Sequence, residues 1–362
     1  MGLSVGIAGL PNVGKSTLLN ALTNAGAEAS NYPFCTIEKN VGIAAVPDPN
    51  LERLQEILSP EEAIPAAVSF VDIAGLIEGA SKGEGLGNKF LGHIREADAI
   101  LHVVRCFDDP NVPHPPGPPD PVRDVAIVET EFLLADLETA ERAAGRWSKA
   151  TKGGTGTGKE EAAAFRRAVD ALSEGSPVST LDLSDKEREV LAEARFLTAK
   201  PCLYVANTGE EDPTGDGPLA RALVQAKGRD RVVPVSVQIE AEISELPSQE
   251  QTTYLRELGL EETALGLVLS ACYRLLDQIT FYTIAHDKLR AWSLPRGSTA
   301  QEAAGRIHTD MESGFIRAEV MTLDDLVEWG SRQSLHDHGL IHIVGRDHEV
   351  RDRDVLQIHF KP

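Results

Sequence analysis

The chain has 362 residues, of which 56 are acidic and 35 are basic, giving a formal net charge of −21 at pH 7. A hydrophobic fraction of 42% is typical of a folded protein, and the length predicts two or three domains. The negative charge argues against binding to free DNA. Because no apolar stretch reaches transmembrane length and the N-terminus begins directly with a predicted strand, we expect no membrane segment and a cytoplasmic location. Four widely separated cysteines argue against structural zinc and against a disulfide framework.

A phosphate-binding loop lies almost at the N-terminus, where residues 9–17 read Gly-Leu-Pro-Asn-Val-Gly-Lys-Ser-Thr. A buried strand is predicted before this loop and a helix after it, which is the context that gives the motif its meaning. The backbone N–H groups then face an anion beside the positive end of the helix. We expect Lys15 to bridge the β- and γ-phosphates and the Ser16 hydroxyl to hold Mg²⁺. The predicted nucleotide-binding residues here are Asn12, Val13, Gly14, Lys15, Ser16 and Thr17, and Lys15 is also predicted to be catalytic.

A second motif, Asp-Ile-Ala-Gly at residues 72–75, directly follows another predicted strand. Asp72 is expected to reach Mg²⁺ through water, and the Gly75 N–H to face the γ-phosphate. Leu76 stands where Ras-like switch GTPases place the Gln that orients the attacking water, so that group is missing. Between the two motifs, Thr36 supplies a further hydroxyl. The predicted metal ligands are Ser16, Thr36 and Asp72.

Base selection depends on an Asn-Lys-x-Asp element in many switch GTPases, and here residues 207–210 read Asn-Thr-Gly-Glu. The Asp that accepts both donor groups of guanine is replaced by Glu210, which is one methylene longer, and the Lys that covers the base is Thr208. Losing that bidentate contact is expected to weaken guanine specificity. Asn207, Glu210 and Ser236 are therefore the predicted contacts near the base.

The strand pattern stops near residue 124 and resumes at 202–206 and 232–235, so an insertion interrupts one α/β domain. Within the insertion, apolar residues step by four and three over 133–147 and 162–172. This spacing favours an antiparallel coiled-coil arm, while ordinary core helices remain the alternative. After residue 279, short strands and one helix predict a small α+β unit. The predicted boundaries are 1–127 and 201–278 for the nucleotide-binding domain, 128–200 for the helical insertion, and 279–362 for the C-terminal unit.

With these motifs in order, the chain resembles the YchF family of Obg-like ATPases over essentially its whole length. The resemblance includes the phosphate loop, residues 31–38, residues 71–76, the variant element at 207–210, and the segments 307–310 and 314–318. It implies an α/β P-loop NTPase with a parallel-rich sheet, a helical coiled-coil insertion, and a C-terminal TGS domain of β-grasp type. It also implies a preference for ATP over GTP.

The resemblance suggests a replacement for the missing Gln. Family members carry a mobile loop with an Asn-x-x-His element, which matches residues 111–114 here, so His114 becomes a predicted catalytic residue. A loop histidine without a role is an equally weighted alternative. Asn12 matches a position that binds potassium in some related switch GTPases, so K⁺ joins Mg²⁺ as an expected cofactor.

These features lead to a hypothesis of an Mg²⁺-dependent, slow ATP-hydrolysing switch that binds the ribosome and acts in translation or a stress response. One alternative is a GTP-hydrolysing translation factor. Another is a nucleotide-gated regulatory binding protein in which hydrolysis is incidental. A metabolic kinase fits least, because no dedicated acceptor-substrate site is recognisable in the sequence.

Overall fold

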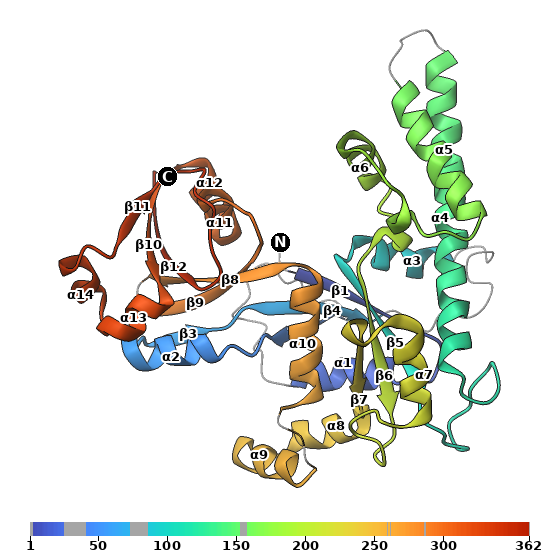
Figure 1. Cartoon of the computed structure of the whole chain (residues 1–362), viewed down its shortest axis with the longest axis horizontal. Helices are drawn as coiled ribbons and strands as arrows, with labels where there is room; N and C mark the ends of the chain where they lie inside the picture. The colour runs from blue at the N-terminus through green and yellow to red at the C-terminus, as the bar shows by residue number, and fades with distance from the viewer. Residues whose placement is uncertain are drawn as a thin grey trace. The chain divides into compact units, whose positions relative to one another are not determined.

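The computed structural model describes residues 3–24, 41–72, 86–152, 158–258, 260, 262–285 and 287–361. The chain forms two compact units. The larger unit combines residues 4–21 with 70–264, and the smaller unit combines 1–3, 22–69 and 265–362. Figure 1 labels most of the helices and strands of both.

The larger unit holds all or part of the strands β1 (Leu3–Ala8), β4 (Ala67–Asp72), β5 (Ala99–Cys106), β6 (Cys202–Thr208) and β7 (Val232–Val235). Its helices are α1 (Lys15–Asn24), α3 (Leu86–Glu96), α4 (Pro121–Lys152), α5 (Lys159–Ser173), α6 (Asp185–Ala192), α7 (Pro218–Lys227), α8 (Val237–Glu245) and α9 (Ser248–Glu257). Short 3-10 turns occupy η3 (Val178–Thr180), η4 (Leu197–Ala199) and η5 (Arg229–Arg231).

The first sheet has the strand order β2-β4-β1-β5-β6-β7, in which β2 spans Val41–Ala45. Strands β1, β5, β6 and β7 pair in parallel, with Val5 opposite Ala99 and Tyr204 opposite Val232. Every residue of β5 is buried, as expected for an apolar strand in the middle of a parallel sheet. Because the strands are parallel, the loops that follow β1, β5, β6 and β7 meet at one edge. The predicted parallel-rich α/β fold is confirmed.

The insertion is helical, and α4 and α5 run side by side (Figure 1). Their shared core includes Ala140, Phe165 and Leu172, three of the residues in the predicted apolar stripes, and Trp147 packs against it. A further helix of the insertion, α6, begins at a capping box formed by Ser184 and Glu187.

The helices α4 and α5 form an arm, and we call the region around Asp136, where α4 meets η4, the foot of the arm. Asp136 is a completely buried carboxylate. It accepts hydrogen bonds from the Leu197 N–H at 3.0 Å and from the Thr198 N–H and hydroxyl, both at 2.8 Å. Arg95 forms an ion pair with it at 3.2 Å. Burial raises the pKa of Asp136, while the hydrogen bonds from Thr198 and Leu197 oppose that shift. The network ties α4 to the turn η4 that leads back into the sheet.

The smaller unit contains the strands β2 (Val41–Ala45), β3 (Glu62–Ile64), β8 (Gln278–Ala285), β9 (Lys288–Pro295), β10 (Phe315–Thr322), β11 (His342–Val344) and β12 (Asp354–Phe360). Its helices are α2 (Pro49–Leu58), α10 (Ala264–Leu275), α11 (Ala300–Ile307), α12 (Thr309–Ser313), α13 (Leu323–Trp329) and α14 (Arg332–Asp337). The second sheet has the order β11-β10-β12-β8-β9-β3, and a core including Phe281, Phe315 and the alanines of α11 lies against it.

The second sheet takes one strand from far upstream in the sequence. β3 pairs in parallel with β9, and α2 packs against α13 and β9. The Tyr282 hydroxyl donates to Asp48, the N-cap of α2, at 2.9 Å. Residues 46–64 thus belong structurally with the C-terminal strands, which the sequence pattern did not reveal. The four domain boundaries and the TGS assignment stay predictions. In the residues that the structure describes, no helix combines the length and apolarity needed to cross a membrane.

Candidate active site

The phosphate loop leaves β1 in a backbone conformation that requires glycine at two positions. Gly9 has φ +147° and Gly14 has φ +100°. A Cβ atom on Gly9 would lie 2.4 Å from the Val103 carbonyl oxygen of β5, and one on Gly14 would lie 2.5 Å from the Asn207 amide nitrogen. Asn12 also has a left-handed φ of 61°. The close approach to β5 and β6 therefore requires glycine at positions 9 and 14, and Asn is one of the residues that adopt the left-handed conformation most readily.

Lys15 opens α1 and lies under the loop, with 7% of its surface exposed. Its ammonium group donates to the Leu10 carbonyl at 2.6 Å. Burial lowers the pKa of Lys15 from its ordinary value of 10.5 to about 8, and the negative charge of Asp72 partly offsets this. A phosphate group would provide the buried cation with a stronger partner than a carbonyl oxygen.

Ser16 and Asp72 meet beside Lys15 at the carboxyl edge of the sheet. The Ser16 hydroxyl donates to Asp72 Oδ2 at 2.8 Å. The other oxygen, Asp72 Oδ1, is buried and has no hydrogen-bond partner among the described residues. The Ser16 hydroxyl and the Asp72 carboxylate are hard oxygen donors, and one carboxylate oxygen is still free to bind a cation. Such donors fit Mg²⁺. The other residues predicted for this end of the site, Thr36 and Gly75, lie outside the described residues, as does Leu76.

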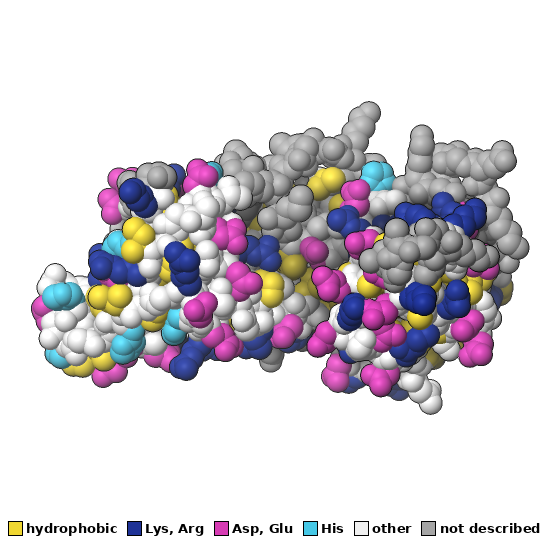
Figure 2. All heavy atoms as spheres, turned by 90° about the horizontal axis from the view of Figure 1, so that it is seen from above, with side chains coloured by type: hydrophobic (Ala, Val, Ile, Leu, Met, Phe, Trp, Pro, Cys, Tyr) yellow, Lys and Arg dark blue, Asp and Glu magenta, His cyan; other side chains and the backbone are white. Residues whose placement is uncertain are grey.

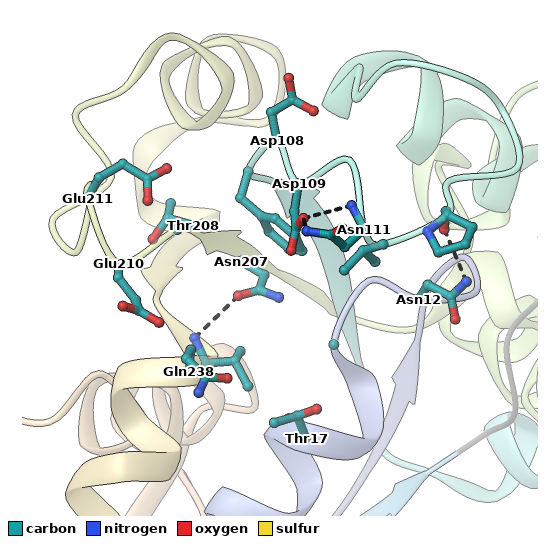
Figure 3. Close-up of a pocket in the computed structure, with 16 residues that line it drawn as sticks. Asn12, Thr17, Asp108, Asp109, Asn111, Asn207, Thr208, Glu210, Glu211 and Gln238 are labelled. Atoms are coloured by element: carbon teal, nitrogen blue, oxygen red, sulfur yellow. Dashed lines mark hydrogen bonds between the residues drawn. The ribbon is translucent and has the colours of Figure 1, made fainter.

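A cleft of about 700 Å³ opens beside the phosphate loop (Figure 3). Of the predicted nucleotide-binding residues, Asn12, Gly14, Thr17, Asn207 and Glu210 line it. The rest of its wall is formed by Phe107, Asp108, Asp109, Asn111, Val112, Pro113, Thr208, Gly209, Glu211, Val237 and Gln238. The volume is within the usual range for a small-molecule site.

Asn207 connects three loops at the carboxyl edge. Its amide nitrogen donates to the Val13 carbonyl at 2.8 Å. Its amide oxygen accepts from the Val237 N–H at 3.3 Å, the bond drawn as a dashed line from Asn207 in Figure 3. Both ends of the side chain are thus used to join the phosphate loop to α8. Nearby, the hydroxyls of Thr208 and Ser236 are buried without hydrogen-bond partners in the described part of the chain. Thr208 lines the cleft, so its hydroxyl is available to a ligand that enters, whereas Ser236 is not among the lining residues.

His114 lies at the end of the cleft-lining loop, but it is not among the residues that line the cleft. Its ring is instead buried, with Nε2 2.7 Å from Asp124 Oδ2 in the first turn of α4. Arg123 holds the other oxygen of Asp124 at 2.8 Å. The loop backbone itself stays attached to the phosphate loop, because the Asn12 amide donates to the Pro113 carbonyl at 3.0 Å. The catalytic role of His114 stays a prediction.

Sequence reasoning missed two features of the cleft. One is its acidic wall, formed by Asp108, Asp109 and the pair Glu210–Glu211. The other is Arg105, which is buried under the loop 107–113. The only sequence signal for Arg105 was a charged residue near the end of a mostly apolar strand.

The sheet carries a phosphate loop after β1, an acidic residue at the end of β4 and an Asn near the end of β6. A parallel sheet with these features defines a P-loop nucleoside triphosphatase.

Comparisons with known proteins narrow this class. One family model, described as "50S ribosome-binding GTPase", matches residues 4–133, and a C-terminal YchF-GTPase model, described as "Protein of unknown function (DUF933)", matches residues 278–361. The protein named Ribosome-binding ATPase YchF from Escherichia coli O157:H7 is 46% identical over 361 residues, covering 99% of both chains. The protein of that name from Bacillus subtilis strain 168 is 43% identical over 364 residues, covering 99% of this chain and 100% of the relative.

A solved structure of the Schizosaccharomyces pombe YchF GTPase superposes with a TM-score of 0.87 at 33% identity, covering 99% of this chain and 98% of that one. Full-length similarity at these identities is shared by both the nucleotide-binding and the C-terminal parts. This chain belongs to the YchF family, and the predicted family membership is confirmed.

Proposed function

We propose that this chain is a Mg²⁺-dependent switch that binds and slowly hydrolyses ATP and docks on the ribosome. The observation that carries the proposal is the arrangement of Lys15, Ser16 and Asp72 at the phosphate loop, with a buried cation and an unpartnered carboxylate oxygen. The full-length relatives named ribosome-binding ATPases support the nucleotide and the partner. A ribosomal partner would in turn imply a cytoplasmic location.

In this proposal, Lys15 turns from the Leu10 carbonyl to the phosphates, and Ser16 and Asp72 hold Mg²⁺. The metal, when bound, neutralises the charge that develops on the phosphate oxygens. The backbone around Gly14 orients the phosphates beside the N-terminus of α1. With no Gln at position 76, unassisted hydrolysis should be slow, on the order of 10⁻⁴ to 10⁻² s⁻¹ by analogy with other switches.

The proposed water-activating group is His114, whose imidazole must first leave Asp124 to reach a phosphate. Replacing His114 by Ala is expected to lower ATP turnover at least tenfold and to leave the affinity for a non-hydrolysable ATP analogue within about twofold. Unchanged turnover would exclude the role. If the variant is inactive but supports growth like wild type, the alternative of a regulatory binding protein is favoured.

Potassium is a further proposed cofactor, held near the phosphates by Asn12. The Asn12 amide now donates to the Pro113 carbonyl, so its oxygen is the atom that a cation would use. Turnover should be faster in K⁺ than in Na⁺ buffer at equal ionic strength, and equal rates would reject the proposal.

A GTP-hydrolysing switch is the second candidate, favoured by the family description and by the name of the fission yeast structure, both of which specify a GTPase. The residues predicted to lie near the base favour ATP, because Glu210 and Thr208 replace the Asp and Lys that guanine recognition uses. Calorimetric titration with non-hydrolysable ATP and GTP analogues tests this. We expect the adenine analogue to bind at least tenfold more tightly, and a guanine preference would overturn the assignment.

The ribosome is negatively charged, and so is this chain. Figure 2 shows Lys and Arg side chains interspersed with Asp and Glu over the visible face. Docking should therefore depend on local groups of basic residues rather than on overall charge. Co-sedimentation with ribosomes at increasing salt tests the partner, and loss of binding to both ribosomes and their large subunits at physiological salt would reject it.

A further inference from the structure

The wall of the cleft formed by residues 107–113 is built around one buried arginine. Arg105 is the penultimate residue of β5, and only 1% of its surface is exposed. Among the residues that the structure describes, no carboxylate lies within ion-pair distance of its guanidinium. A buried cation without an acidic partner is costly unless each of its donors is used in another way.

All three nitrogens of Arg105 donate to carbonyl oxygens of the loop that follows β5. Nε donates to the Phe107 carbonyl at 3.1 Å, Nη1 to the Val112 carbonyl at 2.8 Å and Nη2 to the Asp109 carbonyl at 3.0 Å. The guanidinium also lies over the Phe107 ring, 4.5 Å from its centroid. One side chain thus fixes the first, third and sixth residues of a seven-residue loop.

This loop also forms part of the wall of the cleft in which the nucleotide is proposed to bind. Phe107, Asp109 and Val112, whose carbonyls turn inward to Arg105, all line the cleft, as do their neighbours Asp108, Asn111 and Pro113. The loop meets the phosphate loop through the hydrogen bond from Asn12 to the Pro113 carbonyl. The position of this wall relative to the phosphate loop therefore depends on the three bonds from one guanidinium.

We propose that Arg105 is a positioning residue for nucleotide binding: it holds the loop 107–113 in the conformation that closes one side of the ATP cleft. The inference rests on the proposed function, because it takes ATP as the occupant of the cleft. It concerns the shape of the site alone, since Arg105 itself does not line the cleft.

The guanidinium fork is what the loop requires, because its nitrogens diverge toward three separate carbonyls. Lysine keeps the charge but presents its three donors from a single atom, so it cannot reach all three oxygens. We expect Arg105→Lys in the full-length chain to weaken binding of a non-hydrolysable ATP analogue at least tenfold in calorimetry with Mg²⁺, and to raise KM for ATP by a similar factor. Arg105→Ala should do the same, with partial recovery of affinity when millimolar guanidinium is added.

Arg95 provides a matched control within the same unit. Its guanidinium likewise donates to backbone carbonyls, at Ala135 and Arg195, but at the foot of the arm. We expect Arg95→Lys to lower the thermal midpoint by as much as Arg105→Lys does, while the affinity for the ATP analogue stays within twofold of wild type.

Three outcomes separate the possibilities. If Arg105→Lys binds the analogue within twofold of wild type, or if the two lysine variants lose affinity equally, Arg105 has only a structural role and the inference is wrong. If Arg105→Lys does not fold, failure of guanidinium to restore affinity to Arg105→Ala contradicts it in the same way. If the wild-type chain itself binds no ATP analogue, the proposed function fails and this inference fails with it.

Discussion

Two carboxylates of the larger unit, Asp136 and Asp72, differ in how completely the protein satisfies them. Asp136 accepts three hydrogen bonds and pairs with Arg95 at the foot of the arm. Asp72 has one oxygen bonded to Ser16 and the other buried without a partner among the described residues. The hydrogen bonding of Asp136 is complete without a ligand, whereas Asp72 has an oxygen that can still bind one. In this pair, the carboxylate with an unpartnered oxygen is the one predicted to hold the metal, and the fully hydrogen-bonded one belongs to a structural network.

The largest expected effect tests the structural side of this comparison. Asp136→Ala leaves Arg95 and three donors without their shared acceptor, so the free energy of unfolding should fall by about 3 kcal/mol. Urea denaturation measures this change. Affinity for an ATP analogue should remain within about twofold. A variant with wild-type stability would show that the foot of the arm does not depend on this network.

For Asp72→Asn we expect the reverse of Asp136→Ala, namely a large loss of activity and a small change in stability. Because the Asn side chain is a poor Mg²⁺ ligand, ATP turnover should fall roughly 100-fold, the size seen when one preorganised electrostatic group is removed. The free energy of unfolding should change by less than about 1 kcal/mol, since the folded protein loses no complete network. Turnover assays over a range of Mg²⁺ concentrations, with Asp136→Ala measured in parallel, decide between the two patterns.

The lowered pKa of Lys15 predicts a pH dependence of binding. In the ligand-free protein, Lys15 loses its proton near pH 8, whereas ATP binds the protonated form. The affinity for ATP should therefore fall by up to about tenfold per pH unit above pH 8. The sign for stability is opposite. Between about pH 8 and 10.5 the unfolded chain binds the extra proton, so this group makes the ligand-free protein more stable as pH rises.

Calorimetry of ATP binding at pH 7 and 9 measures this linkage. In buffers of different ionisation enthalpy, proton uptake should accompany binding at pH 9 and be nearly absent at pH 7. Lys15→Arg, whose guanidinium stays charged throughout this range, is the control that should remove the uptake. Equal affinity at both values of pH in wild type would contradict the assignment.

The smallest expected effect concerns the acidic wall. Asp108 lines the cleft and is exposed, so its repulsion of a triphosphate is screened by solvent. Asp108→Asn should therefore tighten ATP binding only about two- to threefold at low salt, and less at high salt. Asp230→Asn in η5, exposed but not part of the cleft, serves as the control with the same change in net charge.

The parts of the fold that were predictable from the sequence depend on local patterns. The phosphate loop, the parallel strands and the capping box at Ser184 follow from residues close together in the chain. The addition of β3 to the second sheet was not predictable, because Glu62–Ile64 is only three residues long and pairs with a strand more than 200 positions later.

The site was predictable to the same extent. Lys15, Ser16 and Asp72 come together as their motifs suggested. The pairing of His114 with Asp124, and the bonds from Arg105 to the loop, depend on how a loop folds back over the sheet. No spacing in the sequence encodes such contacts, since the acceptors of Arg105 are backbone carbonyls that any residue carries.

One property of α4 has a mechanical consequence. It is a single helix from Pro121 to Lys152, and its first turn contains Asp124, the partner of His114. Because the Asp136 network anchors α4 partway along its length, the helix would rotate about that point. At 1.5 Å per residue the helix extends about 18 Å from Asp124 to Asp136 and about 24 Å from Asp136 to Lys152, so a rotation by roughly 5° would displace the far end by about 2 Å. A rearrangement around the imidazole would thus be carried to the remote tip as a displacement of similar size.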